Sequence, residues 1–106
     1  MPKYMIQASY TAEGTQGLLK DGGTKRRAVV EEISKSLGGK LESFYYAFGP
    51  DDVFALVEMP DHATVAAFAL AVNATGAVRI KTSVLMTPEE IDQAAKKTVG
   101  YRAPGR

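Results

Sequence analysis

A chain of 106 residues is long enough for one domain only, because domains typically span about 100–150 residues. The 13 Lys and Arg residues nearly balance the 12 Asp and Glu residues, which excludes the basic surface expected of a non-specific nucleic-acid-binding protein. The absence of cysteine excludes disulfides and thiolate chemistry, and no apolar run approaches the about 20 residues that span a bilayer, so we expect a cytoplasmic protein.

The first third of the chain predicts a strand, a loop and a helix. Lys3–Thr11 alternates apolar and polar side chains, as in a strand that is buried mainly on one face. Ala12–Gly23 contains four glycines and predicts a loop, whose two leucines are expected to pack as a lid or a short helical turn. Thr24 is expected to cap a helix in which apolar residues recur at helical spacing until Gly38-Gly39 ends it.

The middle of the chain predicts a β-hairpin. Lys40–Phe48 and Val53–Met59 are strand-like runs, and the four residues between them, Gly49–Asp52, suit a tight turn. Proline pre-sets φ at the second position of such a turn, and aspartate is tolerated at the third. The first and last residues of this turn, Gly49 and Asp52, are therefore interpreted as turn residues rather than ligand-binding residues.

A second helix is predicted over His62–Thr75. Pro60 cannot donate to a sheet ladder, Asp61 is a good N-cap, and Gly76 follows the end of the helix. Apolar residues occur on all sides of the helix axis, so we expect a second surface to cover those that one buried face cannot hold. His62 itself is expected to be solvated and, with no second histidine or cysteine nearby, predicts no metal site.

The last third predicts a fourth strand, a third helix and a tail. Ala77–Met86 alternates along its length as a strand does. Thr87–Glu90 has the signature of a capping box with proline at the first helical position, which begins a helix through about Thr98. We expect one domain over residues 1–99, and a tail over residues 100–106 that is disordered or packs on a neighbouring subunit.

The order β-α-β-β-α-β, followed by a C-terminal helix, is that of the split βαβ or ferredoxin-like arrangement in the α+β class. Its four-stranded antiparallel sheet carries both main helices on one face and leaves the other face open. Phe54 and Leu56 would lie on the open face, so the same sheet of a second subunit is the expected cover. The result would be a homodimer of the dimeric α+β barrel type, with a cavity of mixed polarity between the two sheets.

Polar and charged side chains of the open face are the candidate ligand-binding residues. Glu58 on the third strand and Arg79 and Lys81 on the fourth are expected to share this face, and burying such charges requires an ionic partner or a ligand. A ligand site and an ion pair at the dimer interface both stay open for these three residues. The full set of candidates comprises Gln7, Ser9, Tyr46, Glu58, Arg79 and Lys81.

Two other features allow alternative interpretations. Tyr45 and Tyr46 alternate across a strand, so one is expected in the core and the other on the dimer face. Lys25-Arg26-Arg27 places positive charge at a helix N-terminus, where it opposes the helix macrodipole. This basic cluster is interpreted as solvated or as a contact to an acidic subunit, with an anion site as the alternative.

Spaced residues along most of the chain resemble the GYD domain family. They are Tyr10-Thr11, Gly14, Arg27, Leu37-Gly38-Gly39-Lys40-Leu41, Phe44-Tyr45-Tyr46, Gly49, Asp52, Val57-Glu58, Pro60-Asp61, Gly76, Val78-Arg79 and Thr82. The resemblance covers about Lys3–Glu90 and implies the dimeric α+β barrel fold, in a family whose members mostly have no assigned activity. The Gly-x-Tyr-Asp turn that names the family falls on Gly49–Asp52, with Asp51 in the position of the tyrosine.

Two functions of different classes are compatible with this sequence. The first is a binding module, a homodimer or a multiple of dimers, whose inter-sheet cavity holds a small anionic or aromatic metabolite without converting it. The second, implied by the resemblance, is a cofactor-free monooxygenase or isomerase of the dimeric α+β barrel type, which requires a base with a shifted pKa that residue spacing does not identify. We favour the first, with no cofactor, no metal, and no nucleic-acid or membrane partner.

Overall fold

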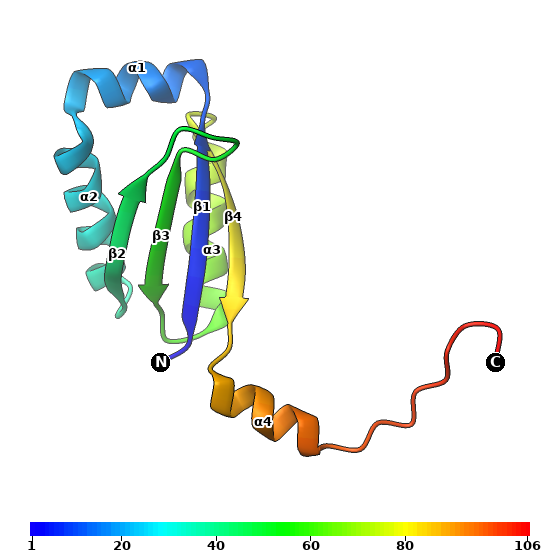
Figure 1. Ribbon diagram of the computed structural model, residues 1–106. Coiled ribbons are helices and arrows are strands. Elements are labelled where there is room, and N and C mark those ends of the chain that lie inside the picture. The colour runs from blue at the N-terminus through cyan, green and yellow to red at the C-terminus, as the bar shows by residue number, and fades with distance from the viewer.

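The computed structural model describes residues 1–106 as a four-stranded antiparallel sheet with helices on one face and a C-terminal arm (Figure 1). The strands lie in the order β2-β3-β1-β4. The predicted α+β class and four-stranded antiparallel sheet are confirmed. In chain order the elements are β1 (Lys3–Tyr10), α1 (Ala12–Asp21), α2 (Gly23–Ser36), β2 (Lys40–Tyr46), β3 (Val53–Glu58), α3 (His62–Ala74), β4 (Val78–Leu85) and α4 (Pro88–Lys96).

Two crossover connections explain the strand order. The chain passes from β1 through α1 and α2 to β2, and leaves the position beside β1 free for β3. It then passes from β3 through α3 to β4 on the other side of β1, which is the split βαβ connectivity. Helix α3 lies behind the sheet in Figure 1, so the face toward the viewer carries no helix. None of the helices combines the length and the apolar character needed to cross a membrane.

The prediction of a loop over Ala12–Gly23 is wrong, because most of this segment forms helix α1. The Thr11 hydroxyl accepts a hydrogen bond from the Gly14 N–H at 3.3 Å and caps the helix, and this cap together with packing at Gly14 outweighs the low helix propensity of glycine. The predicted cap at Thr24 is also wrong. Helix α2 begins one residue earlier and is preceded by Gly22 at φ 87°, with no side-chain cap.

The hairpin connection is longer than the predicted four residues. Strand β2 ends at Tyr46 and β3 begins at Val53, which leaves six residues between them. The Ala47 N–H donates to the Asp52 carbonyl at 2.8 Å, and the Asp52 N–H donates to the carbonyl of Ala8 on β1 at 2.7 Å. The connection, which precedes β3, therefore also bonds to β1. The predicted tight turn involved only β2 and β3.

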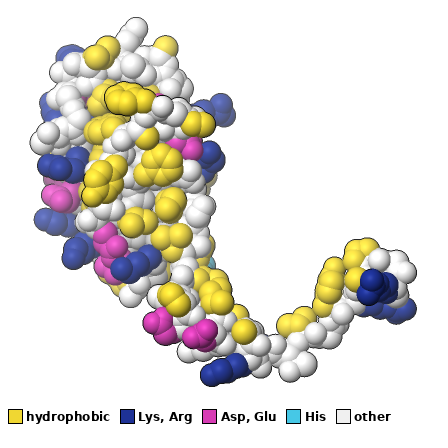
Figure 2. Space-filling model, viewed as in Figure 1, with side chains coloured by type: hydrophobic (Ala, Val, Ile, Leu, Met, Phe, Trp, Pro, Cys, Tyr) yellow, Lys and Arg dark blue, Asp and Glu magenta, His cyan; other side chains and the backbone are white.

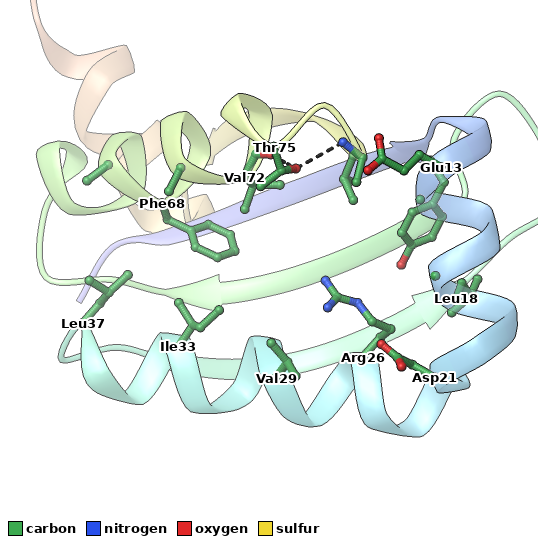
Figure 3. A pocket seen from close by; sticks show the side chains of 17 residues that line it. Glu13, Leu18, Asp21, Arg26, Val29, Ile33, Leu37, Phe68, Val72 and Thr75 are labelled. Carbon is green, nitrogen blue, oxygen red and sulfur yellow. Dashed lines mark hydrogen bonds between the residues drawn. The ribbon is translucent and has the colours of Figure 1, made fainter.

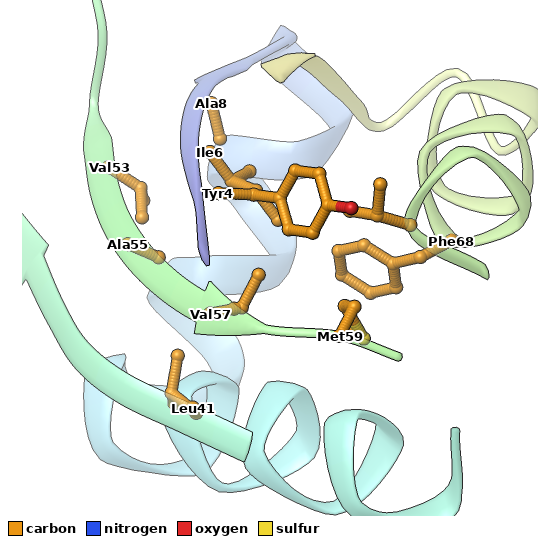
Figure 4. Packing of buried hydrophobic residues seen from close by; sticks show 10 residues of the cluster. Tyr4, Ile6, Ala8, Leu41, Val53, Ala55, Val57, Met59 and Phe68 are labelled. Atoms are coloured by element: carbon orange, nitrogen blue, oxygen red, sulfur yellow. The ribbon is translucent and has the colours of Figure 1, made fainter. Parts of the chain in front are cut away.

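The core lies between the sheet and the helices (Figure 4). Phe68 and Val65 of α3 pack against the side chains that β1 and β3 direct to this side. Tyr4 is fully buried, and its hydroxyl forms a hydrogen bond with Nδ1 of His62 at 2.5 Å, which satisfies the one polar atom of this side chain. The buried apolar residues are Tyr4, Ile6, Ala8, Leu41, Val53, Ala55, Val57, Met59, Val65 and Phe68.

The predicted capping box of α4 is confirmed. The Thr87 hydroxyl accepts from the Glu90 N–H at 3.1 Å, and the Glu90 carboxylate accepts from the Thr87 N–H at 2.9 Å. The helix ends at Lys96, two residues before the predicted end. No residue of α4 is buried, and the segment after β4 extends away from the body of the domain (Figure 1).

We expect Thr87→Ala to loosen α4 without affecting the sheet. Loss of an N-cap hydroxyl costs about 1 kcal/mol, which corresponds to roughly fivefold faster hydrogen exchange of the α4 amides. Amides of β1 and β3 should keep their exchange rates, because α4 does not pack against them. Thr98→Ala is the matched control, since Thr98 lies just beyond the helix and should leave all rates unchanged. Equal exchange in the wild type and Thr87→Ala would contradict the cap.

Candidate binding site on the open sheet face

The open face of the sheet carries an apolar centre and charged ends. Strand register places Met5 of β1 between Leu56 of β3 and Ser83 of β4, and Gln7 between Phe54 and Lys81. Tyr45 of β2 lies opposite Phe54 on the same face and is 69% exposed. Figure 2 shows hydrophobic side chains gathered on this face, with charged groups around them.

A polar cluster occupies one end of this face, and Asp51 is at its centre. Asp51 is only 7% exposed, and its carboxylate accepts hydrogen bonds from Gln7 Nε2 at 3.0 Å and Ser9 Oγ at 3.0 Å. Lys81 Nζ lies 3.2 Å from the same carboxylate. The structure thus brings together three of the predicted candidates, Gln7, Ser9 and Lys81, around a fourth residue that the sequence analysis treated only as part of a turn.

The neighbouring residue fixes the loop that carries Asp51. The carboxylate of Asp52 accepts a hydrogen bond from the backbone N–H of Tyr10 at 2.8 Å. This bond and the backbone bond to Ala8 attach the loop to the end of β1 at two points. Asp52 therefore has the structural role predicted for it, and Asp51 is held over the sheet as a result.

The hydrogen bonds around Asp51 favour its ionised form. Burial by itself raises the pKa of Asp51. The hydrogen bonds from Lys81 and Ser9, the charge of Lys81 and the hydrogen bond from Gln7 outweigh burial, and the pKa lies below its usual value. The cluster is therefore a carboxylate surrounded by donors near neutral pH.

We expect Asp51→Asn to be less stable than the wild type at pH 7, and the difference to shrink in acid. A lowered folded-state pKa means that the stabilisation is fully present above the unfolded value of about 3.9 and is lost as the pH falls through the folded pKa. Thermal unfolding of both proteins from pH 7 to pH 2 measures this. Asp92→Asn, which removes a carboxylate exposed on α4, is the control. A difference independent of pH would show that the charge of Asp51 has no role.

Two predicted candidates lie away from this cluster, and the first is Tyr46. It faces the helix side of the sheet, where its hydroxyl donates to the Gly23 carbonyl at 3.1 Å. Burial, with the nearby Tyr10 phenol adding to it, raises the pKa of Tyr46 to about 12. Of the two neighbouring tyrosines, Tyr45 is therefore the one on the open face, and Tyr46 is not part of a site there.

Glu58 lies at the opposite end of the open face. It pairs in register with Lys3, whereas Arg79 pairs with Ser9, six residues along β1 and about 20 Å away. Glu58 and Arg79 therefore cannot pair within one chain, and an ion pair between them at a dimer interface stays a prediction. At the Glu58 end, Lys3 forms an ion pair with Glu42 at 2.7 Å, and this contact raises the pKa of Lys3. Arg79 forms no ion pair and lies exposed beside the Asp51 cluster.

A cleft that the sequence analysis missed lies on the opposite side of the sheet, between α2 and α3 (Figure 3). Its volume is about 620 Å³, within the usual range for ligand pockets, and its walls are mostly hydrophobic. Val29, Ile33 and Leu37 line it from α2, and Phe68 and Val72 line it from α3. The excess of apolar residues around α3 was the only sequence signal for this cleft.

No cluster in the chain has the composition of a metal centre. Groups of three or more His, Cys, Asp or Glu side chains that could hold a metal ion do not occur. His62, the one histidine, lies exposed at the start of α3, and its Nδ1 forms a hydrogen bond with the Tyr4 hydroxyl.

The chain was compared with known proteins. A distant relative is the "Glutamine synthetase and cystathionine beta-lyase binding protein" of Thermus thermophilus, which is 29% identical over 82 residues, 77% of this chain and 85% of the relative. No solved structure matches the chain. The GYD domain model matches residues 4–95, which include all of the sheet except Lys3, the loop that carries Asp51 and most of α4. Since this match covers most of the chain, the protein belongs to the GYD domain family.

Proposed function

We propose that this protein is a homodimeric binding module that associates with an enzyme of amino-acid metabolism, of the glutamine synthetase or cystathionine β-lyase kind. The name of the Thermus thermophilus relative states that it binds these two enzymes, and the two chains share most of their length. The observation in this protein that carries the proposal is the exposed surface of α3.

Helix α3 contains no Asp, Glu, Lys or Arg over its 13 residues. Leu70 is 72% exposed on it, and Ala63 and Ala66 are exposed beside Leu70. An uncharged, apolar helix surface is unusual on a monomeric protein and is typical of a site where another protein packs. This surface faces away from the sheet, so it stays accessible when the open sheet face is used for self-association.

Self-association through the open sheet face is the second part of the proposal. Met5, Phe54 and Leu56 form an apolar centre that a second copy of the same face would cover. Pairing of identical surfaces by a two-fold axis is the commonest way for a small protein to bury such a face. The two sheets would then enclose the Asp51 clusters of both subunits.

Binding of the purified enzymes tests the first part directly. Glutamine synthetase and cystathionine β-lyase from the source organism should co-elute with the immobilised wild type. Leu70→Asp should weaken this binding at least about tenfold, because it places a charge at the centre of the proposed contact. Leu19→Asp changes an equally exposed leucine on α1 and should bind as the wild type does. Equal binding by both variants, or no binding by the wild type, would refute the proposal.

A second candidate function is binding of a small anionic metabolite between the sheets. Arg79 favours it, because this side chain forms no ion pair and lies beside Ser9 and the Asp51 cluster. In the enclosed cavity Arg79 and Lys81 would donate charge-assisted hydrogen bonds to the anion, with Gln7 and Ser9 nearby. Tyr46 and Glu58 have no part in this site, since they lie on the other face and at the other end.

We expect Arg79→Met to abolish retention of such a ligand. A hydrogen bond to a charged group contributes roughly 1.5–3 kcal/mol, so affinity should fall about 10- to 100-fold while the dimer persists. Native mass spectrometry of the purified protein measures bound small molecules. Arg102→Met on the tail is the control. Adding Glu58→Gln should not restore ligand retention, because Glu58 is too distant to couple with Arg79 within one chain. A ligand retained equally by Arg79→Met and the wild type would reject this site.

The cofactor-free monooxygenase or isomerase is the alternative function. It would require a side chain that accepts a proton near neutral pH. Burial raises the pKa of Tyr4, and the pKa of Tyr46 is raised to about 12, so both phenols stay protonated. These shifts oppose a role for either phenol as a base, and the binding module is favoured.

A further inference from the structure

The C-terminal arm, residues 87–106, has no partner within its own chain. Every residue of the arm except Ala103 is exposed, including Ile91 at 53%, Val99 at 78% and Tyr101 at 76%. The radius of gyration is 16.9 Å, whereas a compact chain of this length has about 13 Å. The arm extends away from the sheet in Figure 1, and it accounts for this excess.

Helix α4 in this arm has the pattern of a helix that packs on one side. Ile91, Ala94 and Ala95 follow the i, i+3, i+4 spacing and form one apolar stripe, with charged residues on the remaining surface. A helix of nine residues is marginal in water even with good caps, since isolated helices need about 12–15 residues. A stable α4 therefore requires a surface that covers the stripe.

The cleft between α2 and α3 has the size and polarity to cover it. The α2 wall from Arg26 to Leu37 is about 17 Å long, and α4 is about 14 Å long, at a rise of 1.5 Å per residue. On the α3 side the small residues Ala67 and Ala71 line the cleft and allow close approach of a helix.

We propose that the arm, residues 87–106, docks in the α2–α3 cleft of a second copy of this chain. The apolar stripe of α4 lies against Val29 and Ile33 of α2 and against the alanines of α3. This contact uses a different surface from the open sheet face, and on α3 it uses Ala67 and Ala71 rather than Ala63, Ala66 and Leu70. Together the two surfaces would join dimers into a larger assembly.

The charges along the two helices set the direction of docking. Helix α4 is acidic in its first half, at Glu89, Glu90 and Asp92, and basic at its end, at Lys96. On α2 the order is opposite: Arg26 lines the cleft near the start of the helix with Lys25 beside it, and Glu32 lies about two turns later, whereas Arg27 and Glu31 line a separate hollow against β2. With α4 parallel to α2, its acidic half lies nearest Arg26, which forms no ion pair in its own chain, and Lys96 lies nearest Glu32.

The same arm cannot reach the cleft of its own chain. Strand β4 is at the edge of the sheet, and α3 lies between this edge and the cleft. Only Met86 and Thr87 connect β4 to α4, so Leu85 and Pro88 lie at most three residue steps, or about 10 Å, apart. To enter the cleft, α4 would have to cross the full width of α3, about 10–12 Å with its side chains, and then descend on its far side, which this connection is too short to allow.

Cysteine cross-linking tests the docking, because the natural chain has no cysteine. Ala94→Cys on the arm and Ala71→Cys in the cleft are purified separately, mixed and oxidised. A disulfide forms only when the Cβ atoms approach within about 4.5 Å, so the mixed pair should give about tenfold more cross-linked heterodimer than Ala94→Cys mixed with Ala66→Cys. Ala66 is exposed on α3 but does not line the cleft. Peptide mass spectrometry identifies the joined residues.

Three other results would overturn the proposal. Equal yields from the two mixtures would mean that the arm does not enter the cleft. An intrachain bond in dilute Ala71→Cys/Ala94→Cys, without the mixed heterodimer, would place the arm in its own cleft. The third result is an apolar small molecule that co-purifies at one per chain and prevents the cross-link until it is extracted. That molecule, and not the arm, would then be the occupant of the cleft.

Charge reversal at residues outside the hydrophobic core provides an independent test. Lys25→Glu with Arg26→Glu should reduce the cross-link yield several-fold, because it sets like charges against the acidic half of α4. Adding Glu89→Lys and Glu90→Lys to the arm partner should restore the yield. If the α2 substitutions lower the cross-link yield but the substitutions on the arm do not restore it, the parallel direction is rejected. Enzyme binding by the same variants is measured separately, so loss of one interaction is distinguishable from loss of the other.

Discussion

Leu56→Asp should convert the protein from a dimer into a monomer at micromolar concentration. Leu56 lies at the centre of the open sheet face, between Met5 of β1 and Ser43 of β2. In the proposed dimer the new carboxylate would be buried without a partner, at a cost of about 3 kcal/mol, or about 100-fold in the dimer Kd. Multi-angle light scattering over a concentration series measures the change in mass.

The control for this experiment is Leu19→Asp. Leu19 is 81% exposed on α1, outside the proposed interface, so the same substitution should leave the mass and stability unchanged. A wild type that stays monomeric at micromolar concentration would rule out the barrel, and a Leu56→Asp dimer as tight as the wild type would mean that the subunits associate through another surface. Because Leu56 is already partly solvent-accessible within one chain, the monomeric variant should remain folded.

Gly14→Ala should lower the free energy of unfolding by about 3 kcal/mol, because the site has no room for a methyl group. A Cβ at this position would lie 2.0 Å from the carbonyl oxygen of Ala77. That carbonyl cannot move away easily, since it accepts hydrogen bonds from the Thr11 N–H at 3.0 Å and the Thr11 hydroxyl at 3.1 Å. The substitution therefore separates α1 from the start of β4.

Gly17→Ala in the same helix is the matched control. A Cβ at Gly17 meets no atom within 4 Å, and alanine has the higher helix propensity. This variant should be as stable as the wild type, or more stable by up to about 1 kcal/mol. Thermal unfolding should show Gly14→Ala about 15 °C below the wild type. Similar melting temperatures for the two variants would mean that α1 is not held against Ala77.

The strands and three of the four helices were predictable because their signals are local. Alternation along Lys3–Tyr10 and Val78–Leu85 assigned each side chain to one face of the sheet, and the register confirms these faces. The capping box at Thr87 and the cap at Asp61 began helices at the predicted residues. The glycines of Ala12–Asp21 misled the interpretation, because glycine also occurs where a helix packs closely on another backbone, as Gly14 does.

The candidate site was predictable only in part. Period-2 alternation correctly placed Gln7, Ser9, Arg79 and Lys81 on the open face, but alternation does not give the distance along a strand. Glu58 was therefore grouped with Arg79 and Lys81, although register separates it from Arg79 by six residues of β1. Tyr46 was assigned to the open face because the choice between two adjacent tyrosines depends on the strand register.

The sequence alone therefore determined the class, the strands, two of the helix caps and the faces of most strand side chains, since each depends on residues a few positions apart. Tertiary structure decided what meets across long separations. Asp51 contacts Gln7, which is 44 positions away, and Thr11 contacts Ala77, which is 66 positions away. The path of the Ala47–Asp52 loop and the cleft between α2 and α3 also depend on how the sheet assembles. No local pattern encodes these features, because side chains distant in the sequence become neighbours only when the strands pair.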